Sequence, residues 1–329
     1  MSFKLNLDFG SAIAKTSQNN LDPGTTYDVL VVGGGPAGLN AALYASRKGL
    51  VTGILTKRKG GQILDTSEVD NYLGIKSMSG EGLVQEFLSH VDQNGIPVLS
   101  DVEVTGISSG DGVHSLMLDT GETYRARSII VATGSKPRTL GVPGEQEYSG
   151  KGVSYCAICD GPFFKGREVF VAGGGNSAAE AAIDLAKVAS KVTIVHRSQF
   201  RSDKVLTDQL YSNPKISVML GTTITEVIGD GTFKGLKARD NATGEEKLLQ
   251  GDGLFVEIGH DPFTGPFGKL VDLNSHGEII VNLKNETGIP GIYAAGDVTE
   301  VPYKQIVIAA SDGAKAALSA SEYLNRLKA

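Results

Sequence analysis

The sequence predicts an α/β protein in which one pattern occurs twice: a strand, a glycine-rich turn, a helix and a second strand. In the first copy, a short apolar run at residues 29–32 leads into the glycine-rich residues 33–38. In the second copy, an expected strand at 167–172 leads into residues 173–178. This order is typical of a dinucleotide-binding unit on a parallel sheet, so two Rossmann-like domains are expected.

The other elements follow from the same patterns. An alternating, β-rich stretch separates the two units, and strands follow the second unit. Residues 1–26 are expected to form an extension with little regular structure. The expected elements are a helix to about 49, a strand at 51–55, a helix at 179–189, a strand at 191–195, strands that lead to 291–297 and a last helical region at 305–327; the run 128–134 ends the β-rich stretch.

Composition excludes several classes of protein. The net charge of −6 argues against a nucleic-acid partner. No run approaches eighteen apolar residues, and the first residues do not resemble a secretory signal, so neither a membrane span nor secretion is expected. The two cysteines are three positions apart in an otherwise cysteine-free chain of 329 residues. That usage indicates a reactive pair in a reducing compartment, and the expected localisation is cytoplasmic.

The first turn has the G-x-G-x-x-G spacing, with glycines at 33, 35 and 38. Gly33 permits the turn, Gly35 lets the backbone approach a pyrophosphate, and Gly38 lets helix and strand pack. Pro36 and Ala37 begin a helix whose N-terminus faces the phosphate charge. The strand end at residues 55–58 carries no Asp or Glu to accept a ribose hydroxyl, so contacts to the adenosine ribose must come from elsewhere.

The second turn has Gly173, Gly175 and Ala178, an allowed variant of the same spacing, with Asn176 and Ser177 between them. The strand after it also ends without an acid. Basic side chains follow instead, and they are suited to a 2′-phosphate, which favours NADPH over NADH. The alternative is that they are solvated loop charges. These basic residues are His196, Arg197 and Arg201.

Cys156 and Cys159 form a C-x-x-C pair that can close and reopen a small disulfide. A zinc site would need a second cysteine pair, which the chain lacks, and no metal site is predicted. Asp160 follows directly. As a protonated carboxyl it would deliver a proton to a departing thiolate, and the alternative is that it caps a helix.

Gly296 and Asp297 follow an expected buried strand. An Asp at this position can accept hydrogen bonds from polyol hydroxyls, although a simple turn residue is the alternative. The helix after it begins near Lys304 and Gln305, and a helix N-terminus stabilises negative charge on a reduced flavin ring.

Together, these motifs resemble low-molecular-weight thioredoxin reductases, over nearly all of the chain from Tyr27 to the C-terminus. The chain is also similar to the flavoprotein subunit of alkyl hydroperoxide reductase, which carries an extra N-terminal thioredoxin-like module that is not expected here. The motifs that carry the resemblance are Gly33 to Gly38, Gly60-Gly61-Gln62, Ala132-Thr133-Gly134, Cys156 to Asp160, Gly173 to Ala178, Gly296-Asp297 and the stretch 301–306 that contains Lys304, Gln305 and Ile306.

The resemblance implies the flavoprotein disulfide reductase architecture. An FAD domain at 1–138 and 259–329 is interrupted by an NAD(P)H-type domain at 139–258. The family is a homodimer whose inserted domain swings between two arrangements, so that either the disulfide or the nicotinamide meets the flavin. The implied flavin-binding residues are those of the first turn together with Gly61, Gln62, Asn71, Ala132, Thr133, Gly134, Gly296, Asp297, Lys304, Gln305 and Ile306.

The resemblance also implies roles and an activity. Cys159 would be the sulfur nearest the flavin, Cys156 would attack the partner disulfide, and Asp160 would be the acid–base group. Electrons would pass from NADPH to FAD, to the Cys156–Cys159 disulfide and on to thioredoxin or a thioredoxin-like protein.

Two departures from the family pattern leave alternatives open. The donor loop at 196–201 is one residue shorter than the family's loop and lacks its second arginine, and Phe263 replaces an asparagine. NADH or a reduced ferredoxin is therefore an alternative donor, and a peroxiredoxin system an alternative acceptor. A flavin redox sensor without turnover is a further alternative.

Overall fold

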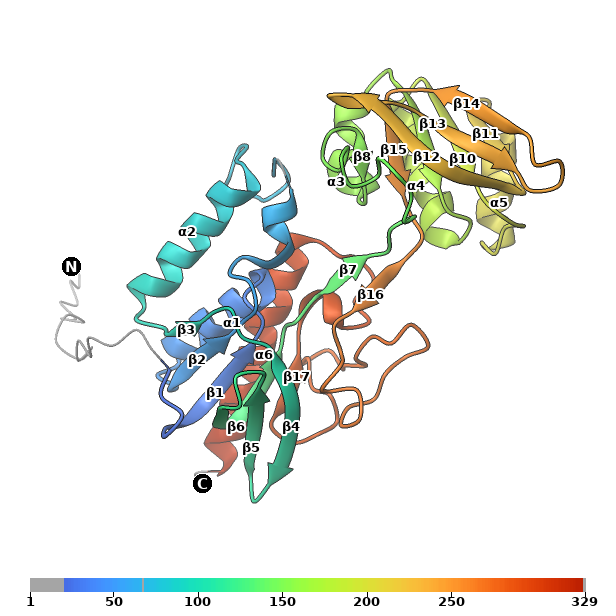
Figure 1. Cartoon of the computed structure of the whole chain (residues 1–329). Helices are drawn as coiled ribbons and strands as arrows, with labels where there is room; N and C mark the ends of the chain where they lie inside the picture. The colour runs from blue at the N-terminus through green and yellow to red at the C-terminus, as the bar shows by residue number, and fades with distance from the viewer. Residues whose placement is uncertain (1–20, 67, 328–329) are drawn as a thin grey trace, which may run out of the picture.

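A computed structural model describes residues 21–66 and 68–327, and it has two lobes joined by a pair of extended segments (Figure 1). Most of the predicted N-terminal extension, residues 1–20, lies outside the described residues. Residues 21–25 form neither helix nor strand, as predicted, and Thr26 already belongs to the first strand. Leu21 is buried in the same hydrophobic cluster as Leu30 and Val32 of that strand.

The larger lobe is built on a seven-stranded sheet in the order β3-β2-β1-β6-β5-β4, with β17 also paired to β6. β1 pairs in parallel with β2 and with β6, whereas β4, β5 and β6 form a meander in which β5 is antiparallel to both β4 and β6. The strands are β1 (Thr26–Val32), β2 (Thr52–Leu55), β3 (Val98–Leu99), β4 (Val104–Gly110), β5 (Val113–Leu118), β6 (Thr123–Val131) and β17 (Ile292–Ala294).

Side-chain alternation along β1 divides this lobe's core into two layers. Val29 and Val31 face the helices α1 (Pro36–Arg47), α2 (Gly80–Gln93) and α6 (Ile306–Leu327). Leu30 and Val32 face the opposite side, where the β4–β5 hairpin and the loop around Phe267 cover the sheet. This period of two is what a strand buried on both faces requires.

The helices α1 and α6 approach each other closely because small residues line their contact. A Cβ atom on Gly313 of α6 would lie 2.0 Å from the carbonyl oxygen of Ala37 in α1. The backbones therefore pack directly, and the start of α1, which follows the first glycine turn, is fixed against the C-terminal helix.

The smaller lobe has a five-stranded parallel sheet in the order β11-β10-β9-β15-β8. The helices α4 and α5 cover one face, and an antiparallel sheet of β12, β13 and β14 covers the other. Its elements are β8 (Val153–Ser154), α3 (Ala157–Asp160), β9 (Glu168–Ala172), α4 (Asn176–Val188), β10 (Lys191–Val195), α5 (Lys204–Ser212), β11 (Ile216–Met219), β12 (Thr222–Asp230), β13 (Thr232–Asp240), β14 (Glu246–Gln250) and β15 (Gly253–Val256).

The chain crosses between the lobes twice, and the two crossings pair with each other. β7 (Ser135–Pro137) leads out of the larger lobe, and β16 (His260–Pro262) returns to it antiparallel to β7 (Figure 1). An ion pair between Arg138 Nε and Asp261 Oδ1, at 2.7 Å, lies beside this ribbon. Two adjacent strands are thus the covalent link between the lobes.

The predicted α/β class with two Rossmann-like units is confirmed. The boundary of one helix differs from the prediction: α4 begins at Asn176 rather than at 179, because residues assigned to the turn already form the first helical turn. Within the described part of the chain, no helix has the length and apolar character needed to cross a membrane.

Candidate active site

The first glycine turn lies between β1 and α1 at the carboxyl ends of the parallel strands. Gly33 has a φ of +122°, and a Cβ there would lie 2.1 Å from the carbonyl oxygen of Ala132. A Cβ on Gly38 would lie 1.9 Å from the oxygen of Gly33. The first and third glycines are therefore required by the fold itself.

Gly35 is different, because the fold does not need a glycine there. Its φ of −80° suits any residue, and a Cβ built on it would meet nothing within 4 Å. The missing side chain leaves open space in front of the N-terminus of α1, which is where a phosphate would bind. The turn therefore fits a dinucleotide pyrophosphate.

The second turn repeats this geometry in the smaller lobe. Gly173 has a φ of +150°, and a Cβ there would lie 2.2 Å from the oxygen of Glu257. Gly175 has a φ of −99° with nothing within 4 Å of a built Cβ, at the start of α4. Both turns thus keep space at the second glycine, which fits a second dinucleotide in this lobe.

A cavity of about 980 Å³ lies between the lobes and reaches both the first glycine turn and the two cysteines. Gly38 and Gly296 do not line it, and neither do the second turn or the 196–201 loop. The predicted site residues that do line it are Gly33, Gly35, Pro36, Ala37, Gly61, Gln62, Asn71, Ala132, Thr133, Gly134, Cys156, Cys159, Asp160, Asp297, Lys304, Gln305 and Ile306.

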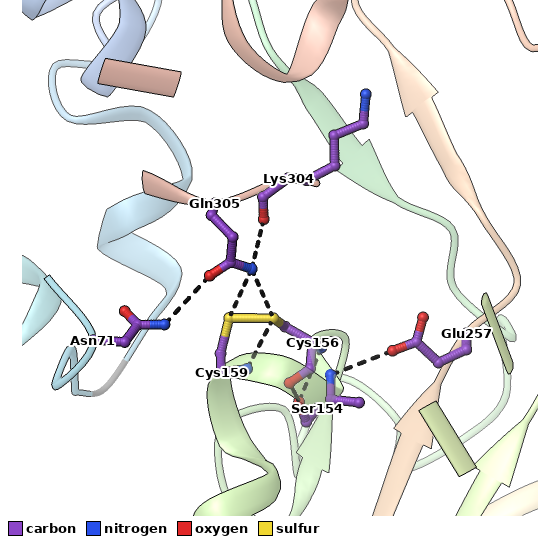
Figure 2. Close-up of a disulfide and its surroundings, with 8 residues drawn as sticks. Asn71, Ser154, Cys156, Cys159, Glu257, Lys304 and Gln305 are labelled. Carbon is purple, nitrogen blue, oxygen red and sulfur yellow. Dashed lines mark hydrogen bonds between the residues drawn. A yellow bond between two sulfur atoms is a disulfide. The ribbon is translucent and has the colours of Figure 1, made fainter. Parts of the chain in front are cut away.

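Cys156 and Cys159 form a disulfide at the start of α3, and Figure 2 shows the larger lobe facing it. The side-chain nitrogen of Gln305 lies 3.8 Å from each sulfur. The Gln305 oxygen accepts a hydrogen bond from Asn71 at 3.3 Å. Gln305, one of the residues predicted to bind a flavin, therefore contacts the disulfide directly.

Asp160 is the last residue of α3, and Cys156 is the residue that caps that helix, through a hydrogen bond from the Cys159 N–H at 3.2 Å. The Asp160 side chain does not cap the short helix that follows it either. Burial raises the pKa of Asp160, while a hydrogen bond with Ser154 opposes the rise. The carboxyl therefore keeps its proton to a higher pH than an exposed Asp, as a proton donor should.

Ser154 forms hydrogen bonds within the segment that carries the disulfide. This residue was not identified from the sequence. Its hydroxyl accepts a hydrogen bond from the Cys156 N–H at 3.0 Å and donates to the Cys156 carbonyl at 3.3 Å. Ser154 is therefore in contact with both Cys156 and Asp160. A serine in a short buried strand has no distinctive sequence pattern, so only the tertiary structure reveals this link.

Asp297 and Lys304 lie on the cavity wall beside α6. Burial raises the pKa of Asp297 to about 6, against the opposing effect of the Lys304 charge. Lys304 Nζ is 2.9 Å from Glu278 Oε1, and both side chains are less than one-fifth exposed. The Lys304 ammonium also donates to the Thr299 carbonyl at 2.7 Å, so this positive charge is held in one place.

The donor loop after β10 is attached to the second turn by its backbone. The Arg201 N–H donates to the Gly174 oxygen at 2.7 Å, and the Asn241 amide donates to the Arg197 oxygen at 2.9 Å. Both arginine side chains are exposed, whereas His196 is buried against Gly174 and bonded to Ser198 at 3.1 Å. Burial lowers the pKa of His196, so any positive charge for a phosphate comes from the two arginines.

Glu257 was also missed in the sequence. It follows β15 directly, its N–H donates to the Ala172 carbonyl at 2.8 Å, and its side chain points toward the disulfide segment (Figure 2). Burial raises its pKa to about 7. The signal that could have found it is a lone acid after the apolar run 254–256, since the carboxyl ends of parallel strands hold functional side chains.

This chain is similar to two kinds of reductase. The F subunit of the alkyl hydroperoxide reductase of Pseudomonas putida is 46% identical over 92% of this chain and 59% of that protein. The chain thus spans about three-fifths of the length of this curated relative. A thioredoxin reductase structure from Streptococcus pyogenes is 36% identical, with a TM-score of 0.88 over 92% of this chain and 99% of that one.

A third relative has a similar sequence identity to this chain but superposes on it less well. The thioredoxin reductase of Lactococcus lactis, described as being in an FR conformation, is 34% identical over 92% of this chain and all of that chain. Its TM-score is nevertheless 0.63. Two relatives of nearly equal identity therefore superpose on this chain very differently.

The sequence profile of pyridine nucleotide-disulphide oxidoreductases matches residues 27–313, which include both glycine turns and the disulfide. The match covers most of the chain and implies a flavin and a pyridine nucleotide as cofactors. The chain therefore belongs to the pyridine nucleotide-disulphide oxidoreductase family.

Proposed function

We propose that this chain is a thioredoxin reductase that takes electrons from NADPH and delivers them through the Cys156–Cys159 disulfide to oxidised thioredoxin. The observation that carries the proposal is the shared cavity: the first glycine turn and the disulfide line the same space. The disulfide of thioredoxin, with a reduction potential of about −270 mV, is suited to accept the electrons. FAD, when bound, supplies a two-electron carrier between the nicotinamide and the disulfide.

We place FAD in the domain formed by residues 1–138 and 259–329, with its pyrophosphate on the first turn. The open space at Gly35 and the N-terminus of α1 fit the phosphates. Asp297, on the cavity wall, would bind the polyol part of FAD, and the N-terminus of α6 would stabilise negative charge on the reduced ring. Gln305 contacts both sulfurs and accepts a hydrogen bond from Asn71, so the proposed flavin-binding wall lies against the disulfide.

The dithiol chemistry then follows from the positions of three side chains. After reduction, the Cys156 thiolate attacks the partner's disulfide and forms a mixed disulfide. Cys159 attacks the Cys156 sulfur of that bond, which restores the Cys156–Cys159 disulfide and releases the partner as a dithiol. Asp160 exchanges the proton with the thiolate that leaves or forms, and its raised pKa supports this role.

We propose that NADPH binds to the inserted domain, residues 139–258, at the second turn. The space at Gly175 fits the pyrophosphate, and the exposed Arg197 and Arg201 fit the 2′-phosphate. Because the second turn does not line the cavity, the smaller lobe must move for the nicotinamide to reach the flavin. The low TM-score with the Lactococcus lactis structure, at nearly unchanged identity, supports such a movement about β7 and β16.

The partner and assembly belong to the same proposal. We propose a homodimer that works on a thioredoxin or a thioredoxin-like carrier. A second candidate function is the reduction of a peroxiredoxin system through such a carrier. It is favoured by the 46% identity with the F subunit of alkyl hydroperoxide reductase, which exceeds the 36% identity with the Streptococcus pyogenes thioredoxin reductase.

The test is to mix the oxidised protein anaerobically with NADPH, NADH or reduced ferredoxin and to follow flavin absorbance. Rapid bleaching with NADPH, followed by steady reduction of thioredoxin, is the expected result. If NADH or reduced ferredoxin bleaches the flavin and NADPH does not, that compound is the electron donor instead of NADPH. Bound FAD without turnover with any donor and either acceptor would instead indicate a redox sensor.

A further inference from the structure

The strand end that usually supplies a carboxylate for ribose recognition carries none in this chain. β2 ends at Leu55, and the following residues are Thr56, Lys57 and Arg58, all of which line the cavity. In dinucleotide folds an Asp or Glu at this place accepts hydrogen bonds from the ribose hydroxyls. Here a lysine and an arginine stand there instead, so the acceptor must come from another segment.

Glu103 brings a carboxylate to this place from a different part of the chain. Its Oε2 atom lies 2.6 Å from Lys57 Nζ, and Glu103 also lines the cavity. The Glu103 side chain is 56% exposed and that of Lys57 is 76% exposed, so both are open to a ligand. A carboxylate thus occupies the end of β2 although the sequence of that strand end lacks one.

The backbone around Glu103 is held in place independently of this ion pair. The Val102 N–H donates to the Thr56 carbonyl at 3.3 Å, which attaches the segment to the strand end itself. The Glu103 N–H donates to Asp119 Oδ1 at 2.9 Å, and the Asp119 N–H donates to the Glu103 carbonyl at 2.9 Å. The backbone that carries the carboxylate is therefore fixed before any ligand binds, which reduces the entropy lost on binding.

The surroundings of Glu103 also suit an adenosine. Val102 and Val104, on either side of it, line the same cavity and are less than one-tenth exposed. The two valines offer an apolar surface to a flat base, and the carboxylate between them offers a hydrogen-bond acceptor to the two adjacent hydroxyls of the attached sugar. Asp65, which also lines the cavity, is paired with Arg58 at 2.8 Å but lies in the short helix that begins at Gly61.

We propose that Glu103 accepts the hydrogen bonds of the adjacent hydroxyls of the adenosine ribose of FAD, in place of the missing strand-end acid. Lys57 pairs with this carboxylate at the cavity wall. This inference rests on the proposed binding of FAD at the first glycine turn. It assigns recognition of the adenosine to Glu103, which lies 46 residues after Lys57 in the sequence.

The test measures the affinity of the apoprotein for flavins by fluorescence quenching, without turnover. Glu103→Gln should weaken FAD binding by about 10- to 100-fold, the usual effect of losing hydrogen bonds to a charged group. Binding of FMN, which has no adenosine, should not change. The matched control is Asp65→Asn, which removes the other ion-paired carboxylate of this wall and should leave FAD binding intact.

A second measurement uses competition by ADP and by 2′,3′-dideoxy-ADP, which lacks both hydroxyls. The original protein should prefer ADP, and Glu103→Gln should bind the two equally. Unchanged FAD affinity in Glu103→Gln, an equal loss of FMN binding, or a loss in Asp65→Asn instead would overturn the assignment. Failure of the original protein to bind either flavin would reject the proposed function rather than this residue.

Discussion

The carboxylate of Glu257 accepts a hydrogen bond from the backbone N–H of Ala157, at 3.3 Å. Ala157 is the first residue of α3, directly after Cys156, so a strand end of the smaller lobe is attached to the segment that carries the disulfide. Burial raises the pKa of this carboxyl to about 7, although the hydrogen bond itself favours the ionised form. Glu257 is thus a titratable group within the structure that supports the redox pair.

This contact predicts how stability depends on pH. The folded protein holds the Glu257 proton up to about pH 7, whereas an unperturbed Glu releases it near pH 4.5. The folded state therefore binds more protons in this window, and its free energy of unfolding falls as pH rises from about 4.5 to about 7. The loss is on the order of 3 kcal/mol.

Glu257→Gln should remove this decline and make the protein more stable than the original above pH 7. Urea denaturation at several pH values measures it. Glu246→Gln is the matched control, because Glu246 is exposed in β14 and should keep the decline. An unchanged pH dependence in Glu257→Gln would show that the carboxyl titrates normally.

Asp160→Asn should slow thioredoxin reduction by on the order of 10²-fold, because the amide cannot exchange a proton with the departing thiolate. The raised pKa of Asp160 further predicts that one limb of the pH–rate profile disappears in this variant. Rates measured across pH test both points. Asp184→Asn, an exposed carboxylate of α4, should behave as the original protein does, and a fast Asp160→Asn enzyme would assign the proton to another group.

Replacing Arg197 and Arg201 together with Gln should raise the KM for NADPH by about 10- to 100-fold, because two charges for the 2′-phosphate are lost. The KM for NADH should hardly change, since NADH has no such phosphate. Lys191→Gln provides the control, because Lys191 lies at the opposite end of β10. Equal effects on both nucleotides would mean that the arginines only support the loop.

Two glycines of the first turn should respond differently to the same substitution. Gly38→Ala places a methyl group 1.9 Å from the Gly33 oxygen, so the apoprotein should lose at least about 3 kcal/mol of stability. Gly35→Ala should fold normally but bind FAD about 1–3 kcal/mol more weakly, since its methyl group enters the space for the phosphates. Denaturation and flavin titration separate the two effects, and tight FAD binding by Gly35→Ala would argue against this phosphate site.

Local patterns were enough to predict the elements that surround both turns. β1, β10 and α6 were expected within a few residues, because each depends on the periodicity or composition of a short segment. The helix α4 was placed three residues late, since the motif that identifies the turn also contains the first turn of the helix. Such errors arise where one residue belongs to two elements.

The contacts that complete the site could not be predicted in this way. Gln305 reaches Cys156 and Cys159 across almost half of the chain, and Glu103 meets Lys57 only because Val102 bonds to the end of β2. Sequence spacing carries no information about such pairs, because the packing of whole elements determines them. The absence of an acid after β2 was visible in the sequence, but the residue that lies in its place was not.

The most direct test of the account counts the electrons that the protein accepts. In an anaerobic titration with dithionite, the original protein should take up twice as many electrons per flavin as Cys159→Ser, because the Cys156–Cys159 disulfide is reduced together with the flavin. Free thiols should appear in the same titration. Equal electron uptake by the two proteins, with the disulfide still closed when the flavin is fully reduced, would contradict the proposed relay.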